Sequence, residues 1–359
     1  MANCAIVGIN WGDEGKGRMV DLLTQDYDVV VRYQGGGNAG HTVINEYGKF
    51  ALHLLPSGVF RKGVVNILGN GVALDPENLW MEIEQVRAQG VSITPENLKI
   101  SDRASILLPW HRDLDALEEQ RLADKKYGST KQGIAPFYSD KYQKKTVMAG
   151  ELFYPETLKG HFADLMEWKN LTLTQVYGAK PYTMEMLDEW IDGFCEKIKP
   201  FICDTGAFLK EAQDAGKRIL FEAQLGSLRD LDYGIYPYTT SSNTTAAYAP
   251  IGSGLPSAKI ENVVGVVKAY STCVGEGPFV VADRSDAVMD QALSQVPERG
   301  ELAHLLIHVA GAGAVDEHRR RDRVGGVVGQ GQQAIERVVC MCSNHDFFGH
   351  HEGFLLVCF

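Results

Sequence analysis

A short glycine-rich run near the start of the chain constrains the fold and the chemistry more than any other feature. The run is Trp11-Gly-Asp-Glu-Gly-Lys-Gly-Arg18, and it directly follows the apolar residues 4–8. This order predicts a buried strand, a glycine-rich turn and then a helix. Backbone amides of such a turn, with the N-terminus of the helix, can hold phosphate oxygens. Lys16 adds a positive charge, and Asp13 offers an oxygen that can bind Mg²⁺ or a proton.

This run differs from the common P-loop in two ways. A P-loop has a glycine six residues before the lysine and a Ser or Thr directly after it, whereas this chain has Asn10 and Gly17 at those places. The hydroxyl that usually binds magnesium is therefore missing, and Asp13 is its obvious replacement. The alternative is a strand-to-helix turn whose glycines serve packing alone.

Short apolar stretches alternate with stretches of helical periodicity over the first 280 residues. Residues 29–31, 64–68 and 219–221 are predicted to be buried strands. Helices are predicted over residues 155–168, 184–199 and 203–216. The second helix has an apolar stripe predicted to belong to the core: Met186, Leu187, Trp190, Ile191, Phe194 and Ile198. This alternation predicts an α/β fold with a mostly parallel central sheet and flanking helices, and ligands of such sheets gather at the carboxyl ends of the strands.

A second glycine-rich loop follows the second predicted strand. It is Gly35-Gly-Gly-Asn-Ala-Gly-His-Thr42. Its glycines allow a ligand to approach the backbone closely, and His41 can donate to a developing oxyanion or exchange a proton. A single histidine is more often structural, so this alternative stays open. Two such loops after the first two strands can converge on one site.

Several collinear motifs together resemble the adenylosuccinate synthetase family over about residues 1–280. They are the two glycine-rich runs, Leu54-Leu-Pro-Ser-Gly58, Gly69-Asn-Gly71, Gly133-Ile-Ala-Pro136, Tyr236-Pro-Tyr-Thr-Thr-Ser-Ser-Asn243 and Ala269-Tyr-Ser-Thr-Cys-Val-Gly-Glu-Gly-Pro-Phe279. The resemblance implies a P-loop-NTPase-like α/β fold and a homodimer. It also implies a ligase of purine biosynthesis, which joins IMP to L-aspartate with GTP and releases adenylosuccinate, GDP and phosphate.

The resemblance also implies a role for individual residues. Asp13 would act as the base on the hypoxanthine ring while the γ-phosphate moves to its 6-oxygen, with His41 and Lys16 stabilising the transfer. Mg²⁺, one ion per subunit, would be held by Asp13 and the Gly40 carbonyl. The implied GTP-binding residues are Gly12, Asp13, Glu14, Gly15, Lys16, Gly17, Arg18, Gly40, His41 and Thr42. The implied IMP-binding residues are Asp13, Lys16, Asn38, Ala39, Gly40, His41, Thr130, Lys144, Gln224 and Thr240.

Two residues depart from the pattern of the family. Lys144 stands where the family usually has an arginine that reaches the IMP phosphate of the partner subunit, and lysine lacks the bidentate fork. In Phe221-Glu-Ala-Gln-Leu-Gly226 the glutamine comes one residue earlier than in the usual Phe-Glu-Gly-Ala-Gln-Gly. One step along a strand would point Gln224 to the opposite face.

The composition changes near residue 280. The chain has 19 lysines before residue 281 and none after it, whereas six of its ten histidines lie in residues 281–359. We therefore divide the chain into a synthetase-like domain, residues 1–280, and a divergent tail, residues 281–359, that is out of frame, disordered or a genuine divergent domain. The aspartate-binding and guanine-binding elements of the family should follow residue 280, and neither is recognisable. His304, His308, Cys340, Cys342, His345, His350, His351 and Arg319-Arg-Arg-Asp-Arg323 do not form a known site pattern.

Charge and hydropathy exclude some classes of partner. A net charge of −11 argues against nonspecific nucleic-acid binding, and no apolar run is long enough for a membrane helix. Without a recognisable secretory signal, and with seven cysteines that show no disulfide framework, a cytoplasmic enzyme is expected. Two rival functions remain. One is a catalytically impaired nucleotide-binding remnant, and the other is the viral-type ligase of dGMP and aspartate, against which Asp13 argues.

Overall fold

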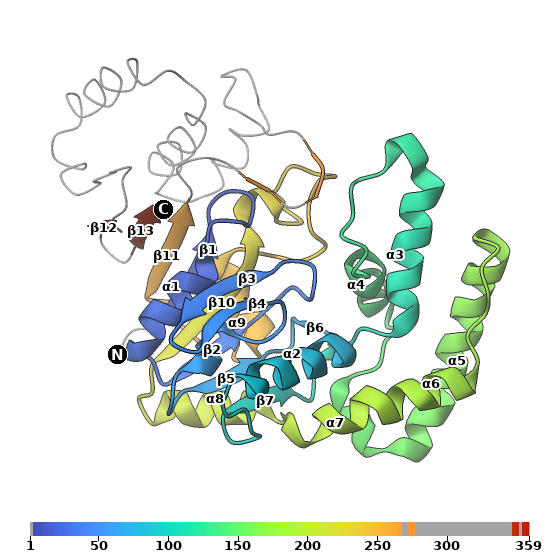
Figure 1. Cartoon of the computed structure of the whole chain (residues 1–359), viewed down its shortest axis with the longest axis horizontal. Coiled ribbons are helices and arrows are strands. Elements are labelled where there is room, and N and C mark those ends of the chain that lie inside the picture. The colour runs from blue at the N-terminus through green and yellow to red at the C-terminus, as the bar shows by residue number, and fades with distance from the viewer. Residues whose placement is uncertain (1–2, 268–271, 274, 278–346, 352–353, 359) are drawn as a thin grey trace.

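The fold is a twisted sheet with helices on both faces (Figure 1). The computed structural model describes residues 3–267, 272–273, 275–277, 347–351 and 354–358. Across the main sheet the order of strands is β12 (Phe347–His351), β13 (Phe354–Cys358), β11 (Asn262–Val267), β1 (Cys4–Gly8), β10 (Ile219–Gly226), β2 (Val29–Arg32), β5 (Val65–Leu68), β7 (Leu98–Ser101) and β9 (Ile202–Cys203). Within these nine strands every pairing is parallel except that of β12 with β13.

Two small strand pairs and a set of helices complete the described part of the chain. The pairs are β3 (His41–Asn45) with β4 (Gly48–Leu52), and β6 (Ala73–Leu74) with β8 (Ser105–Ile106). The helices are α1 (Lys16–Leu23), α2 (Pro76–Ala88), α3 (Pro109–Leu122), α4 (Ile134–Gln143), α5 (Pro155–Leu171), α6 (Met184–Trp190), α7 (Glu196–Ile198), α8 (Thr205–Asp214) and α9 (Ala249–Ser253). The predicted α/β architecture, a mostly parallel sheet with flanking helices, is therefore confirmed.

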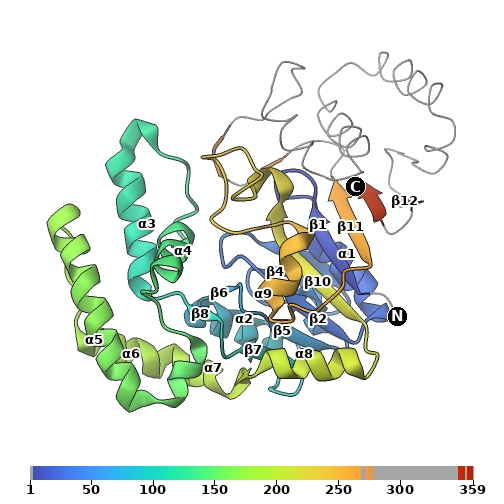
Figure 2. The same ribbon diagram turned by 180° about the vertical axis from the view of Figure 1, so that it is seen from behind.

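The alternation of side chains along the central strands explains why both faces of the sheet are covered. Ile6 of β1 packs with Met19 of α1 on one face. The neighbouring Val7 belongs to a second cluster that includes Leu209 of α8. Successive residues of a strand point to opposite faces, so an apolar strand without alternation needs helices on both sides. Helix α1 lies in front of the sheet in Figure 1, and α8 and α9 lie in front of it in Figure 2.

The predicted strands are present, and two of the predicted helices are regular. The predicted strands 29–31, 64–68 and 219–221 correspond to β2, β5 and the longer β10. The predicted helices 155–168 and 203–216 correspond to α5 and α8.

The predicted helix over residues 184–199 is interrupted. A π-helical turn, Ile191–Cys195, separates α6 from α7. This wider turn changes the periodicity of the residues that follow it. Met186 precedes the turn, and its neighbour Leu187 is the residue of α6 that is buried. Leu187 and Ile198 are buried, whereas Met186 is 48% exposed. The prediction that Met186 lies in the core is wrong, and Cys195 is buried instead.

A buried polar cluster connects three helices beside the sheet. Nε2 of His111 in α3 lies 2.8 Å from a carboxylate oxygen of Asp140 in α4. Nζ of Lys169 in α5 donates to the other oxygen of Asp140. The backbone N–H of Leu108 donates to Nδ1 of His111, which therefore carries no proton. Because Nδ1 is an acceptor here, the cluster requires a neutral histidine.

We expect the free energy of unfolding to fall as the pH falls below about 6.5, the ordinary histidine pKa. Burial lowers the pKa of His111, although its hydrogen bond to Asp140 opposes this effect. The unfolded chain then binds more protons than the folded chain, with a slope of up to about 1.4 kcal/mol per pH unit for one group. Urea unfolding between pH 5 and 8 measures this slope. It should be smaller in His111→Gln and unchanged in the control His161→Gln, and equal slopes in all three would contradict the assignment.

The described residues contain no helix that is both long enough and apolar enough to cross a membrane. The tail motifs noted above, from His304 to Cys342 and His345, lie outside the described residues. Of His350 and His351 only the backbone, in β12, is described. The division of the chain at residue 280 stays a prediction.

Candidate functional site

The two glycine-rich loops meet around the carboxyl end of β10. This strand lies between β1 and β2, so the loops that follow β1 and β2 flank it on either side. The start of α1 touches the second loop directly, because a Cβ atom added to Gly17 would lie 2.8 Å from Cβ of His41. The predicted convergence of the two loops is therefore present, and glycine is required at this contact.

Lys16 lies at the first position of α1 and is almost fully buried. Its Nζ atom donates to a carboxylate oxygen of Glu14 at 2.8 Å and to the Gly12 carbonyl at 3.2 Å. The other carboxylate oxygen of Glu14 accepts from the backbone N–H groups of Asn10 and Gly12. An internal carboxylate thus engages the lysine and two amides of the turn, which is the combination of groups that suits a phosphate.

Asp13 lies at the outer side of the same turn and is exposed. Thr272 donates its hydroxyl to the Asp13 carboxylate at 2.6 Å, which joins the motif around residue 272 to the first loop. Arg18, Gly40 and Thr42 are also exposed. The described residues hold no group of three acidic, histidine or cysteine side chains suited to a metal. A single carboxylate on an exposed turn fits Mg²⁺ only where substrate phosphates supply further ligands.

His41 begins β3 and points into the protein. Its Nδ1 atom lies 2.7 Å from a carboxylate oxygen of Glu222 in β10. Ser57 donates to the same carboxylate through its hydroxyl at 2.7 Å and through its backbone N–H at 2.9 Å. With Nδ1 held, Nε2 is the atom of His41 that remains for a substrate, and it has no partner among the described residues.

Burial and hydrogen bonding set the charges of this pair. Burial lowers the pKa of His41, although the Glu222 carboxylate opposes this effect. Burial would raise the pKa of Glu222, but the hydrogen bonds from His41 and Ser57, with the charge of Arg32, outweigh it and lower that pKa. Glu222 is therefore a buried anion that orients the histidine ring.

Gln224 fixes the shape of the second loop. Its side-chain amide donates to the carbonyls of Gly36 and Ala39, and its oxygen accepts from the Gly36 N–H. The register of β10 against β1 shifts next to it, and Leu225 has a φ of 61°. This irregularity leaves Gln224 turned toward the loop, while Leu225 lines the adjacent cavity. The predicted contact of Gln224 with a nucleotide stays a prediction, since protein groups occupy both ends of its amide.

Replacing Gln224 with glutamate should loosen this loop. A carboxylate cannot donate to the two carbonyls, so we expect the free energy of unfolding to fall by about 1–3 kcal/mol. Urea unfolding measures this loss, and hydrogen exchange at the Gly36 amide should accelerate. Gln120→Glu, at an exposed position of α3, serves as the control. A Gln224→Glu chain as stable as that control would show that these hydrogen bonds do not hold the loop.

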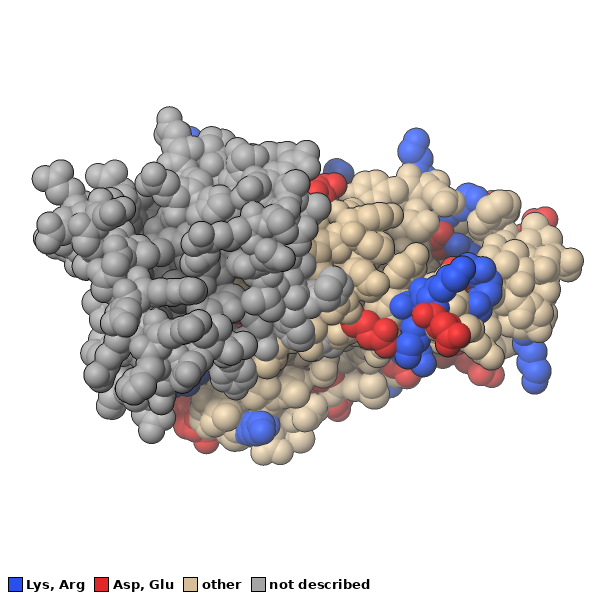
Figure 3. Space-filling view, turned by 90° about the horizontal axis from the view of Figure 1, so that it is seen from above, with Lys and Arg blue, Asp and Glu red and all other residues tan. Residues whose placement is uncertain are grey.

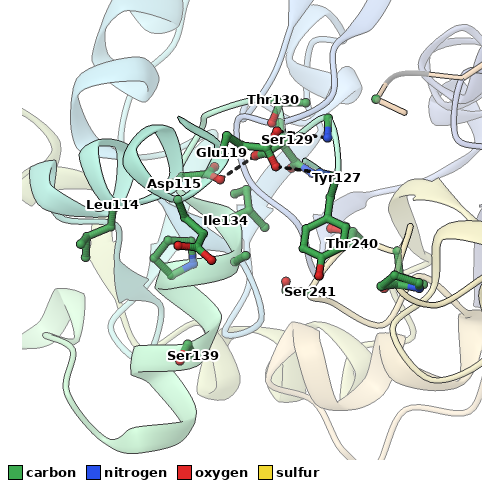
Figure 4. A pocket seen from close by; sticks show the side chains of 18 of the residues that line it. Leu114, Asp115, Glu119, Tyr127, Ser129, Thr130, Ile134, Ser139, Thr240 and Ser241 are labelled. Carbon is green, nitrogen blue, oxygen red and sulfur yellow. Dashed lines mark hydrogen bonds between the residues drawn. The ribbon is translucent and has the colours of Figure 1, made fainter. Parts of the chain in front are cut away.

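A cavity of about 680 Å³ is lined by Asn38 of the second loop and by Leu225, which packs against Gly12 of the first loop. Asn38, Thr130 and Thr240, which are far apart in the sequence, all line it. Figure 4 shows Thr130 and Thr240 in this pocket. Oδ1 of Asn38 and Oγ1 of Thr240 are buried and have no partner among the described residues. Buried polar atoms usually find a partner, so these two atoms indicate a polar ligand in the cavity.

Lys144 does not line this cavity. It is exposed at the end of α4, with a φ of 62°. The structure of a single chain leaves its predicted role toward a partner subunit untested.

Sequence reasoning missed the residues that support the site. Glu222 holds His41, Ser57 holds Glu222, and the cavity is lined by Asp115, Glu119 and Arg229. The sequence does contain a signal for Glu222, because Glu222 and Gln224 alternate with apolar residues in an otherwise apolar strand. Such buried polar residues are uncommon unless they are paired. Ser57 lies in the motif Leu54-Leu-Pro-Ser-Gly58, which does not reveal its role, and Asp115 and Glu119 have no comparable signal.

Comparisons with known proteins agree with this geometry. The family model described as adenylosuccinate synthetase matches residues 5–321. Adenylosuccinate synthetase 1 of Methanosarcina acetivorans is 45% identical over 279 residues, which are 78% of this chain and 65% of that protein. Adenylosuccinate synthetase 2 of Pseudoalteromonas translucida is 47% identical over 284 residues, which are 79% of this chain and 67% of that protein.

A solved structure supports the same assignment. The fully ligated adenylosuccinate synthetase from Plasmodium falciparum superposes with a TM-score of 0.72 and 35% identity, over 78% of this chain and 65% of that one. This chain thus spans about two thirds of the length of the relatives that it matches. The family match, the fold and the paired glycine-rich loops lead to one conclusion: the chain belongs to the adenylosuccinate synthetase family.

Proposed function

We propose that this chain is an adenylosuccinate synthetase, which ligates IMP and L-aspartate at the expense of GTP. The observation that carries this proposal is the meeting of Asn38, Thr130 and Thr240 in one cavity, whose lining residue Leu225 packs against Gly12 of the phosphate turn. Family membership implies IMP contacts for these three residues. Their unpartnered buried oxygens, in Asn38 and Thr240, suit a polar ligand such as a nucleotide.

The reaction would proceed in two steps. Asp13 takes the N1 proton of the hypoxanthine ring while the 6-oxygen attacks the γ-phosphorus of GTP and GDP leaves. The amine of aspartate then attacks C6 of 6-phosphoryl-IMP, phosphate leaves, and adenylosuccinate forms. A ring oxygen is a poor leaving group until it is phosphorylated, so the first step makes the second one possible.

The residues of the site suit these steps. Nε2 of His41 points away from Glu222 and can donate to the transferred phosphoryl group when the ring is protonated. Lys16 and the amides of the turn would hold GTP phosphates after Glu14 releases them. Asp13 and the Gly40 carbonyl would hold Mg²⁺, which when bound neutralises charge on the phosphates.

A direct assay tests the proposal. The purified chain is supplied with GTP, IMP, L-aspartate and Mg²⁺, and adenylosuccinate is measured by chromatography. We expect product that depends on all three substrates. Absence of product under these conditions would overturn the proposal.

Two further outcomes identify the rival functions. Retained IMP binding without turnover would identify an inactive nucleotide-binding remnant, which the unrecognised aspartate and guanine elements favour. Product from dGMP in place of IMP would identify the viral-type reaction.

We also propose a homodimer in the cytoplasm, as the family resemblance implies. Exposed apolar side chains on the helices beside the sheet support a partner, for example Trp168 and Leu171 of α5 at 46% and 52% exposure. Light scattering of the purified chain measures the oligomeric state, and a monomer at micromolar concentration would contradict the dimer.

A further inference from the structure

The segment of residues 127–133, between α3 and α4, has an unusual backbone. Gly128, Lys131 and Gly133 have φ values of 69°, 57° and 75°. A Cβ atom on Gly133 would lie 2.7 Å from the carbonyl carbon of His111, so the segment also approaches α3 closely. Backbone of this kind persists where surrounding groups hold it. Thr130, at its centre, lines the cavity.

Two carboxylates of α3 hold both ends of this segment. Asp115 accepts from the Ser129 hydroxyl at 2.6 Å and from the Gly133 N–H at 2.9 Å. Glu119 accepts from the N–H groups of Tyr127 and Gly128, both at 3.1 Å. Figure 4 shows these side chains reaching from the helix to the segment. The carboxylates are only 5% and 8% exposed, so their hydrogen bonds are shielded from water.

Hydrogen bonds from the segment 127–133, rather than a cation, stabilise the carboxylates of Asp115 and Glu119. Asp115 and Glu119 are four residues apart on one helix, an arrangement in which like charges repel. Neither takes part in an ion pair within the described part of the chain. Buried carboxylates without a cation depend on N–H and O–H donors. All four of the donors named above come from the segment 127–133.

The other side of the segment contacts the opposite wall of the cavity. The rings of Tyr127 and Tyr238 meet edge to face with centroids 6.5 Å apart. Lys126 pairs with Glu276 at 3.1 Å, and Glu276 also lies against Gly128. Basic and acidic side chains lie side by side on the described part of the face in Figure 3. The segment therefore bridges α3 and the loops that carry Thr240.

We propose that Asp115 and Glu119 are positioning residues, which fix the segment 127–133 so that Thr130 faces Thr240 across the nucleotide cavity. The identity of the ligand rests on the proposed function, whereas the contacts between helix and segment do not. Without the pair, the segment would lose four hydrogen bonds at its two ends and Thr130 would lose its fixed place.

We expect different effects when each of the two carboxylates is replaced by the corresponding amide. Both partners of Glu119 are N–H donors, so in Glu119→Gln the new NH₂ group would face a donor. Ser129 can accept as well as donate, so in Asp115→Asn the new NH₂ group keeps a partner. We expect the KM for IMP to rise about tenfold or more in Glu119→Gln and less than about threefold in Asp115→Asn, with kcat and the KM for GTP little changed. Asp113→Asn, at an exposed position of α3, is the matched control.

Hydrogen exchange of the ligand-free chain provides a readout that needs no activity. The amides of Tyr127 and Gly128 should exchange faster in Glu119→Gln than in the unmodified chain or in Asp113→Asn. Unchanged exchange would overturn the proposal, as would an equal rise of the KM for IMP in Glu119→Gln and Asp113→Asn. If the unmodified chain binds no IMP, the proposed function fails, and the exchange comparison still decides whether the pair fixes the segment.

Discussion

Asp13→Asn should abolish adenylosuccinate formation while the protein stays folded. Asparagine cannot take the N1 proton of IMP, and it is a poorer ligand for Mg²⁺. The loss of one acid–base group typically costs about 10²–10⁴-fold in rate, and loss of the metal ligand adds to this. Because Asp13 is exposed, the free energy of unfolding should change by no more than about 0.5 kcal/mol.

The measurement is kcat with saturating substrates, beside circular dichroism and urea unfolding of the same preparation. Asp26→Asn is a suitable control, because Asp26 is exposed just after α1 and has no role in the site. Turnover near that of the unmodified chain would reject Asp13 as the base.

Glu222→Ala should have the largest effect on stability. Its buried carboxylate is hydrogen-bonded to His41 and to the Ser57 N–H, and its negative charge offsets the buried positive charge of Arg32. Arg32 lies opposite Glu222 in the register of β2 and β10, and among the described residues its side chain donates a hydrogen bond only to the His53 carbonyl. Removing one charge from such a cluster typically costs about 3–5 kcal/mol. Urea unfolding measures this loss.

Glu222→Gln separates stability from catalysis. Its amide has the same shape and can still accept from Nδ1 of His41, but its NH₂ group would face the Ser57 N–H. We expect kcat to fall about 10²-fold, because a neutral amide no longer favours the protonated His41 ring that donates from Nε2, with a smaller loss of stability than in the alanine variant. Glu84→Gln, at an exposed position of α2, is the control. If Glu222→Gln matches that control in kcat, the negative charge of Glu222 does not support the protonated form of His41.

The sequence predicts β1, β2, β5 and β10 because these central strands are buried on both faces. Residues 29–31 need no knowledge of distant contacts to be read as a strand, since a short run of valines bounded by polar residues has few alternatives. The helical region is less predictable. The apolar periodicity around Met186 suggests one long helix, but a π-helical turn rotates its later residues. Such a turn depends on packing with other elements.

The residues of the site also divide into those that the sequence predicts and those that it does not. Asp13, Lys16 and His41 could be proposed because they lie in glycine-rich loops after strands. Asp115 and Glu119 could not, because acidic residues four apart on a helix usually face solvent. Their role depends on the path of the following loop, which local sequence does not determine.

The place of β10 in the sheet has a consequence for when the parts of the site come together during synthesis. Both glycine-rich loops leave the ribosome early, but the strand that joins them begins only at Ile219. A chain that ends before this residue has His41 and the second glycine-rich loop, yet it lacks Glu222 and Gln224, which hold them. Pairing across such a sequence separation is slow to form. The nascent chain should therefore place His41 and the second glycine-rich loop only once most of the sheet has assembled.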